Sequence, residues 1–456
     1  MTSTIRLAVM IGACWSLFAY SETLASSPVA TVTGPIPVTV ESGQAYRAEP
    51  SQRPSNLNAY RYGEEEYFVS GSIDGQPYTT SILVRKPVEP AKFSGVVVVE
   101  TLHVQGNTPF WSIYRDRLMN DGHAWVMVAS QRAPLETYIR QSNTARYASL
   151  RIPAAGSAQQ DPSASGPQDS ISQAILTQIG SMLKNNASNA PLAGETVKYL
   201  IMAGVSQTGV TTLRYIQESH ANARLANGAP IYDGYFPSEA LVYEPITRCD
   251  AAVIHVVGEG DFALFKTAER GIQFPNHANS DAASERFREY QFPAGSHLPT
   301  RGVTDARMII GAPLAPDERL SQFPSSAFYY AAFANLVDWI AKGTTPPTAP
   351  PIEVRDGEIV RDTFGNAKGG VRSPYVDMPT VRYIASAPTV EGDSPARRMI
   401  GLQEPLSPQR LRTVYRSREN YIKRFDREVD HLVTQRWLQV KDGEALKADE
   451  ATIPKF

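Results

Sequence analysis

The sequence predicts an α/β fold with a mostly parallel central sheet flanked by helices. Short apolar runs recur along the chain, and such runs are typical of strands buried on both faces. Segments with helical spacing of apolar residues lie between them. Strands that alternate with helices need crossover connections, which make neighbouring strands parallel. With 42% apolar and 20% charged residues, the chain can bury a large core.

The N-terminus is interpreted as a secretory signal peptide at residues 1–25. Arg6 precedes the apolar run 7–20, and small and polar residues follow, with a cleavage point after Ala25. The run is shorter than the roughly 20 residues that span a bilayer, and no other run approaches that length. We therefore expect a secreted or periplasmic protein with no membrane span, whose mature part is residues 26–456.

The first predicted elements are two paired strands. Residues 64–72 and 78–86 are rich in β-branched and aromatic residues and flank the turn residues Asp74 and Gly75. The valine run 96–99 then has the continuous apolar pattern of a strand buried on both faces. These segments predict a hairpin followed by the first central strand.

Helices and buried strands alternate through the middle of the chain. A helix is predicted at 109–120, where Pro109 opens it and Asp121-Gly122 ends it. Apolar runs and helical spacings predict, in order, a strand at 124–129, a helix at 171–185, a strand at 197–203, a helix at 211–220, and strands at 251–257 and 288–292. Residues 153–170, rich in Pro, Ala, Ser and Gly, predict an exposed loop.

The C-terminal part contains two further predicted helices. Residues 327–342 form the first, which Gly343 ends before a proline-rich loop. Apolar residues at helical spacing predict the second within 421–438. Residues 344–420 are interpreted as an irregular excursion over the same domain, so that 26–456 form a single domain.

Composition and charge exclude several classes of protein. Lys and Arg number 44 and Asp and Glu 46, for a net charge of −2 without runs of like charge, so we expect no nucleic-acid partner. The two cysteines, Cys14 and Cys249, exclude a cysteine-rich metal site or a disulfide scaffold. Asn186 opens a glycosylation triplet that matters only in a eukaryotic source. We expect no metal and no organic cofactor, because neither a ligand cluster nor a phosphate-binding loop is present.

The most informative motif is Gly204-Val205-Ser206-Gln207-Thr208-Gly209. It lies between a predicted strand and a predicted helix, where a sharp turn can expose a nucleophilic serine. Such a turn crowds the backbone and needs small neighbours, and Gly204 meets the main demand. The second glycine is Gly209 and not residue 208, which is a small threonine. Ser206 is the predicted nucleophile.

A nucleophilic serine needs a histidine base and a carboxylate that orients the histidine. With this kind of turn the chain order is serine, acid, histidine. Asp261, in a predicted loop after strand 251–257, is the first choice for the acid, and Glu259 is the alternative. His297 follows the last core strand and is preferred as the base over His277 and His431.

Backbone N–H groups are expected to stabilise the negative charge that develops on the substrate oxygen. Gln207, the residue after the nucleophile, is one predicted donor. The other is expected from Leu102 or His103, in the loop after the first buried strand. Glu100 and Gln131 end neighbouring strands at the same edge, where they either line the site or support its loops.

Several segments together resemble a known family of mostly secreted α/β-hydrolase-domain serine esterases. They include EEEYFVSG, FSGVVVVE, AWVMVASQ, AGVSQTG, YDGYFP, AGSH, LVDWIAKGTTPP and GNAKGGVRSP, and they cover roughly residues 30–450. The resemblance implies an α/β-hydrolase fold and a triad of Ser206, His297 and either Asp261 or Glu259. This chain departs from the family pattern at Thr101 and His103, where Trp and Asn are usual, and at Thr208, where Ser is usual.

The expected function is hydrolysis of a small-molecule carboxylic ester through an acyl-enzyme on Ser206. The same triad supports an acyltransferase or a lyase when water access differs. A non-catalytic binding protein on a hydrolase scaffold is the third alternative, but such proteins usually lose a member of the triad.

Overall fold

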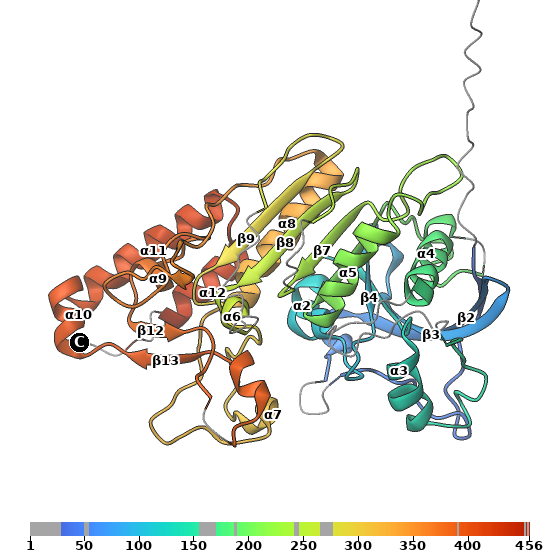
Figure 1. The fold of residues 1–456 in the computed structure, drawn as a ribbon, viewed down its shortest axis with the longest axis horizontal. Helices are drawn as coiled ribbons and strands as arrows, with labels where there is room; N and C mark the ends of the chain where they lie inside the picture. The colour runs from blue at the N-terminus through green and yellow to red at the C-terminus, as the bar shows by residue number, and fades with distance from the viewer. Residues whose placement is uncertain are drawn as a thin grey trace, which may run out of the picture.

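One large sheet runs through the molecule (Figure 1). The computed structural model describes residues 29–49, 54–154, 170–186, 189–240, 246–264, 277–389, 392–450, 453 and 456. Within these residues the main sheet has nine strands in the order β1-β2-β3-β5-β4-β6-β7-β8-β9. The expected signal peptide and most of the predicted loop 153–170 lie outside the described residues.

The strands follow the predicted order with two additions, β1 and β7. They are β1 Thr31–Thr33, β2 Tyr62–Ile73, β3 Gln76–Pro87, β4 Val96–Thr101, β5 Ala124–Val128, β6 Tyr199–Val205, β7 Gly234–Ser238, β8 Ala252–Gly258 and β9 Phe287–Phe292. The hairpin of β2 and β3 turns at Asp74-Gly75, as predicted. The pairs from β1 through β3 to β5 are antiparallel, and those from β5 to β9 are parallel. The mostly parallel sheet is thus confirmed. The strands β1 and β7 were not predicted: β1 has only three residues, and the glycine and proline of β7 hide its strand pattern.

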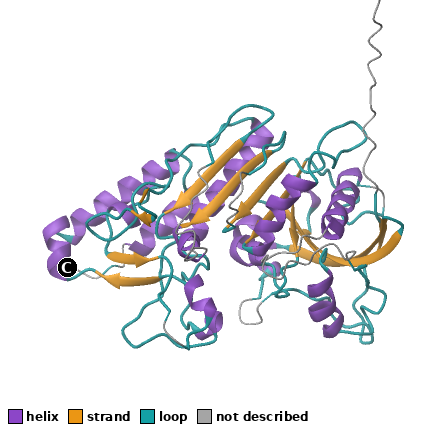
Figure 2. Ribbon diagram, in the orientation of Figure 1, coloured by secondary structure: helices purple, strands orange, loops and turns teal. Residues whose placement is uncertain are grey.

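Helices flank this sheet (Figure 2). Those of eight or more residues are α2 Pro109–Asn120, α4 Ser170–Asn185, α5 Gln207–Glu218, α8 Ser325–Lys342, α10 Pro408–Tyr415, α11 Arg418–Thr434 and α12 Val440–Glu450. Shorter ones are α1 Leu57–Tyr60, α3 Arg132–Pro134, which a π-helical segment Leu135–Arg140 continues, α6 Glu259–Leu264, α7 Arg307–Ile310 and α9 Pro374–Asp377, with 3-10 turns at Pro90–Lys92 and Pro395–Met399. The helix α2 has the predicted bounds. None of the helices in the described ranges is long and apolar enough to cross a membrane.

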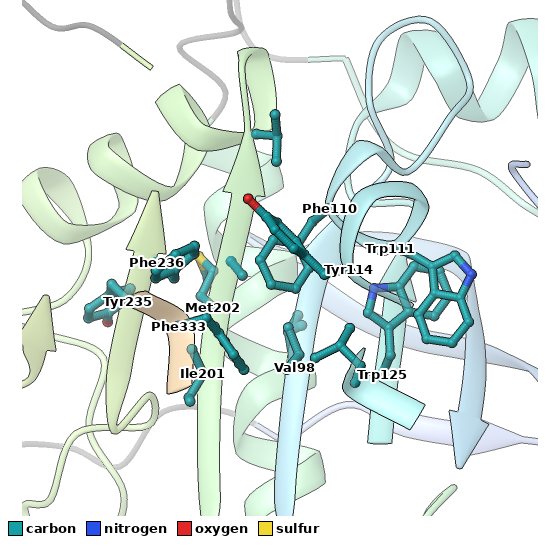
Figure 3. Close-up of a cluster of buried hydrophobic side chains, with 14 of the residues drawn as sticks. Val98, Phe110, Trp111, Tyr114, Trp125, Ile201, Met202, Tyr235, Phe236 and Phe333 are labelled. Atoms are coloured by element: carbon teal, nitrogen blue, oxygen red, sulfur yellow. The ribbon is translucent and has the colours of Figure 1, made fainter. Parts of the chain in front are cut away.

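Alternate residues of β7 show how the two faces are covered. The Tyr235 ring lies 6.1 Å from the ring of Tyr215 in α5. The next residue, Phe236, packs against Phe110 of α2 and Phe333 of α8, with ring centroids 6.0 and 5.4 Å away. Because successive strand side chains point to opposite faces, α5 covers one face and α2 and α8 cover the other. Figure 3 shows the cluster that these rings form with β4 and β6.

A buried carboxylate fixes the start of α2. Glu100 accepts hydrogen bonds from the backbone N–H groups of Phe110 and Trp111 at 2.7 and 2.9 Å, and from Trp125 Nε1 at 3.0 Å. Burial raises the pKa of Glu100 to about 8, and the three N–H donors act in the opposite direction. Of the two roles expected for Glu100, the structure shows the supporting one: it anchors the far end of the loop that follows β4.

The segment 344–420 is more regular than predicted. It contains two small antiparallel sheets, β10 Val354–Arg355 with β11 Glu358–Ile359, and β12 Val381–Ile384 with β13 Leu402–Pro405. Figure 1 shows β12 and β13 beside the C-terminal helices α10 to α12. Two-stranded pairs this short carry little periodicity, which explains why the sequence pattern missed them.

Candidate active site

Ser206 occupies a strained turn between β6 and α5. Its φ and ψ are 58° and −124°, a backbone conformation that costs energy for a residue with a side chain. The Ser206 N–H donates to Ser238 O of β7 at 3.0 Å and so holds the turn against the neighbouring strand. The serine side chain is thereby placed at the carboxyl edge of the parallel strands, where ligands bind in open α/β sheets.

The two glycines of the motif are explained by close backbone contacts. A methyl group on Gly204 would lie 2.2 Å from the carbonyl oxygen of Thr208, and one on Gly209 would lie 2.7 Å from Ser238 O. Thr208, in the place between them, is fully buried, and its Oγ1 lies 2.9 Å from both the N and the O of Val205. Thr208 therefore links the start of α5 to the end of β6. The close approach of Ser238 O requires the second glycine at position 209 and not at position 208.

His297 and Asp261 complete a hydrogen-bonded chain with Ser206. His297 Nε2 lies 2.9 Å from Ser206 Oγ, and His297 Nδ1 lies 2.5 Å from Asp261 Oδ1. A carboxylate accepts only, so Nδ1 carries the proton and Nε2 faces the serine hydroxyl as an acceptor. All three groups come from the ends of different strands, β6, β8 and β9. The imidazole is buried, and the arrangement lets His297 take the Ser206 proton.

The sequence predicted Asp261 in a loop, but the structure places it in the first turn of a short helix. The helix α6 begins directly after β8, and Asp261 Oδ2 accepts the N–H of Gly258 at 2.8 Å. Gly260 allows the tight start: its N–H donates to Gly295 O at 2.7 Å, and a methyl group there would lie 2.4 Å from Ala385 O. These contacts turn the fully buried carboxylate back toward His297.

Glu259 points to other partners. Its Oε2 accepts the N–H of Ala294 at 2.8 Å, and its Oε1 pairs with Arg361 Nη1 at 2.8 Å. Ala294 has φ 65° and lies three residues before His297. The side chain of Glu259 therefore supports the loop that carries the histidine, whereas Asp261 is the carboxylate that contacts the imidazole.

The structure contradicts two of the expected oxyanion donors. The N–H of Leu102 donates to Val128 O at 2.8 Å, and the N–H of His103 donates to Asn107 O at 2.9 Å. Both N–H groups are already bound to backbone carbonyls that shape the loop after β4, so neither is free to donate to a substrate oxygen. The N–H of Val104 instead reaches Gln207 Oε1 across a long 3.4 Å. The N–H of Gln207 lies in the first turn of α5, where the helix supplies no acceptor.

His103 has a defined tautomer beside this loop. Its Nδ1 accepts the N–H of Gln105 at 3.1 Å, so the ring proton is on Nε2. Burial, with a smaller contribution from His297, lowers the pKa of His103 to about 4. The ring is therefore neutral at pH 7 and offers an N–H donor. Gln131 is also buried, and both atoms of its amide lack a partner within the described residues.

The remaining histidine candidates lie elsewhere. His277 Nε2 is 3.9 Å from a carboxylate oxygen of Glu289, and burial lowers the pKa of His277. His431 is exposed in the last turn of α11. His255 is fully buried within β8, as expected of a core residue. Across the described residues, His, Cys, Asp and Glu side chains form no group of three or more that could hold a metal ion.

Comparison with known proteins identifies the family. The family model described as "Alpha/beta hydrolase domain" matches residues 32–448. None of the curated proteins compared with the chain matches it. A proposed dienelactone hydrolase from Klebsiella pneumoniae is a similar solved structure, at 14% identity and a TM-score of 0.32 over 62% of this chain and 99% of that chain. The Est1E protein from Butyrivibrio proteoclasticus shows 10% identity and a TM-score of 0.27 over 50% and 90%. Because the family model spans most of the sequence, the chain belongs to the alpha/beta hydrolase domain family.

Proposed function

We propose that this protein is a serine hydrolase that cleaves carboxylic esters through an acyl-enzyme intermediate. The observation that carries the proposal is the chain of hydrogen bonds from Asp261 through His297 to Ser206 at a strained turn. A serine hydroxyl is inert at its ordinary pKa, and this chain is the arrangement that activates it.

The reaction proceeds in two halves. His297 Nε2 takes the proton of Ser206 as Oγ attacks the ester carbonyl, and it then protonates the departing alcohol. Water attacks the acyl-enzyme with the same histidine as base. Asp261 holds the imidazole in the reactive tautomer and stabilises the imidazolium that forms in each half.

The developing oxyanion requires donors on the other side of the carbonyl. The N–H of Gln207 supplies the first, at the N-terminus of α5, where the helix dipole favours negative charge. We assign the second to the N–H of Val104, because its long bond to the Gln207 side chain is the one in this loop that a substrate oxygen can readily replace.

A fluorophosphonate probe with a panel of p-nitrophenyl esters of varied acyl size tests this proposal. The probe should label the parent at Ser206, and Ser206→Ala should show neither labelling nor turnover. Adding a competing alcohol separates hydrolysis from acyl transfer, because only a transferase gives mainly the new ester. A folded parent that is neither labelled nor active on any ester would refute the proposal.

The proposed setting is outside the cytoplasm, after removal of residues 1–25. The support is the charge and hydropathy pattern of that segment. N-terminal sequencing of protein recovered from the culture medium or periplasm should begin near Ser26. Retention of the full chain in the cytoplasm would contradict this.

A further inference from the structure

Glu239 has a strained backbone and lies next to the strands that carry Ser206 and Asp261. It directly follows β7, which lies between β6 and β8, the strands that lead to Ser206 and Asp261. Its φ is 50°, a left-handed conformation that is uncommon for glutamate. The N–H of Glu239 donates to Val256 O of β8 at 2.8 Å, and the preceding carbonyl, Ser238 O, accepts the N–H of Ser206 at 3.0 Å. The backbone at Glu239 is thus tied to both neighbouring strands.

The Glu239 carboxyl group is buried without a partner. The residue is 1% exposed, and within the described part of the chain neither carboxyl oxygen has a hydrogen bond. The hydroxyl groups of Tyr114 in α2 and Tyr329 in α8 are also buried, and neither makes a well-aligned hydrogen bond within the described residues, although the side chain of Ser238 lies near the first and that of Ser325 near the second. The charge of Glu239 acts on the hydroxyls of Tyr114 and Tyr329, and the charge of Asp261 acts on Glu239 and Tyr329, so these groups share one electrostatic environment. Figure 3 shows the Tyr114 hydroxyl at the edge of the aromatic cluster.

The Tyr329 hydroxyl lies against the turns that carry the acid and the base. A methyl group on Gly258 would lie 2.9 Å from Tyr329 Oη, and one on Gly295 would lie 2.5 Å from it. Gly258 is the residue whose N–H binds Asp261, and Gly295 lies two residues before His297. The Tyr329 hydroxyl therefore lies directly behind the turns that carry Asp261 and His297.

The charge state of this cluster follows from its neighbours. Two adjacent buried carboxyl groups do not both ionise. Asp261 accepts hydrogen bonds from the N–H of Gly258 and from His297 Nδ1, which favour a carboxylate at that position. Burial and the neighbouring Asp261 raise the pKa of Glu239 well above its ordinary value. Glu239 then keeps its proton and can donate one hydrogen bond. The two carboxyl oxygens of Glu239 are costly to leave without hydrogen bonds. A buried water typically makes two to four hydrogen bonds, and the two tyrosine hydroxyls supply further partners for it.

We propose that the carboxylic acid of Glu239 and the hydroxyls of Tyr114 and Tyr329 hold buried water behind the triad, and that Glu239 is a positioning residue for Asp261. The water donates to a free lone pair of the Asp261 carboxylate, which has about four acceptor positions and two protein donors. The kinetic part of this inference rests on the proposed esterase function.

Three variants test the role of Glu239 on one activated ester. Glu239→Gln keeps a donor and an acceptor in nearly the same shape, and it should retain kcat within about threefold. Glu239→Leu removes both, and kcat should fall roughly 10- to 100-fold with KM within about twofold, the range for a lost hydrogen bond to a charged group. Tyr329→Phe, which keeps the ring packing, should lower kcat about tenfold and covers the case that the leucine variant fails to fold.

The results separate positioning from packing. A packing role would make leucine and glutamine equivalent, so full activity of Glu239→Leu would overturn the proposal. Equal loss in Glu239→Gln and Glu239→Leu would also overturn it, because the residue would then act as a charge. A crystal structure of the parent at about 1.8 Å should show water within hydrogen-bond distance of Glu239 and Tyr329, and an empty cluster would refute the hydration. This last readout holds even if the parent proves inactive on esters, which would refute the proposed function alone.

Discussion

Replacing Asp261 by asparagine should invert the tautomer of His297. Asp261 Oδ2 accepts the N–H of Gly258 at 2.8 Å, so the amide oxygen of the asparagine must take that position. Its NH₂ group then occupies the position of Oδ1, 2.5 Å from His297 Nδ1, where it donates instead of accepting. The ring proton is consequently held on Nε2, which faces Ser206 and can no longer accept the serine proton.

The expected cost is about four orders of magnitude in kcat, the size of effect seen when a triad aspartate is neutralised in this way. That factor corresponds to about 5.5 kcal/mol of lost transition-state stabilisation. Glu259→Gln is the matched control, two residues earlier in the same helix. Its amide oxygen still accepts the N–H of Ala294, and only the ion pair with the half-exposed Arg361 is lost. We expect this control to lose less than about tenfold, because partly exposed pairs contribute little.

Both variants should be measured on one activated ester, with circular dichroism and thermal unfolding as checks that each is folded. The ratio of the two kcat values identifies the carboxylate that orients His297. If Glu259→Gln were crippled beside a nearly active Asp261→Asn, the orienting carboxylate would be Glu259, and the contacts described for both side chains would not represent the working enzyme.

Three further predictions follow from the same geometry. Ser206→Ala and His297→Ala should each lose on the order of a millionfold in turnover, and the double variant should be no worse; His277→Ala should stay within about twofold, and a swap between the two histidine variants would reassign the base. Gly204→Ala should lower the unfolding temperature sharply, since its methyl group would meet Thr208 O at 2.2 Å; an unchanged unfolding temperature would show that the turn relaxes. Burial lowers the pKa of His103 and of His123 to about 4, so the unfolded chain binds more protons between about pH 6.5 and 4, and stability should fall as pH falls through that window. Urea unfolding at pH 7 and 4.5 should show a smaller loss for His123→Gln than for the parent.

Local patterns in the sequence were enough to locate most of the elements. Continuous apolar runs predicted β4, β6 and β8, because a strand buried on both faces is apolar at every position. Apolar residues at helical spacing predicted α2, α4 and α8, because a helix buries one stripe of its surface. The short strands β1 and β7 and the pairs β10–β11 and β12–β13 were missed. Their few residues gain stability from neighbours distant in sequence and carry no period of their own.

The sequence by itself determined where a nucleophile could lie, because the strain at Ser206 is local: a glycine two residues before it and a strand-turn-helix pattern around it. It could not decide between Asp261 and Glu259, because that choice depends on Gly258, Ala294 and Arg361, which reach the two carboxyls from three separate segments. It also misassigned the donors at Leu102 and His103, since a backbone N–H reveals its acceptor only when the loop is folded. The fold depends on the burial of apolar residues, which is summed over many positions and is therefore visible in the sequence. Catalysis depends on the direction of single hydrogen bonds, and only the tertiary structure defines those directions.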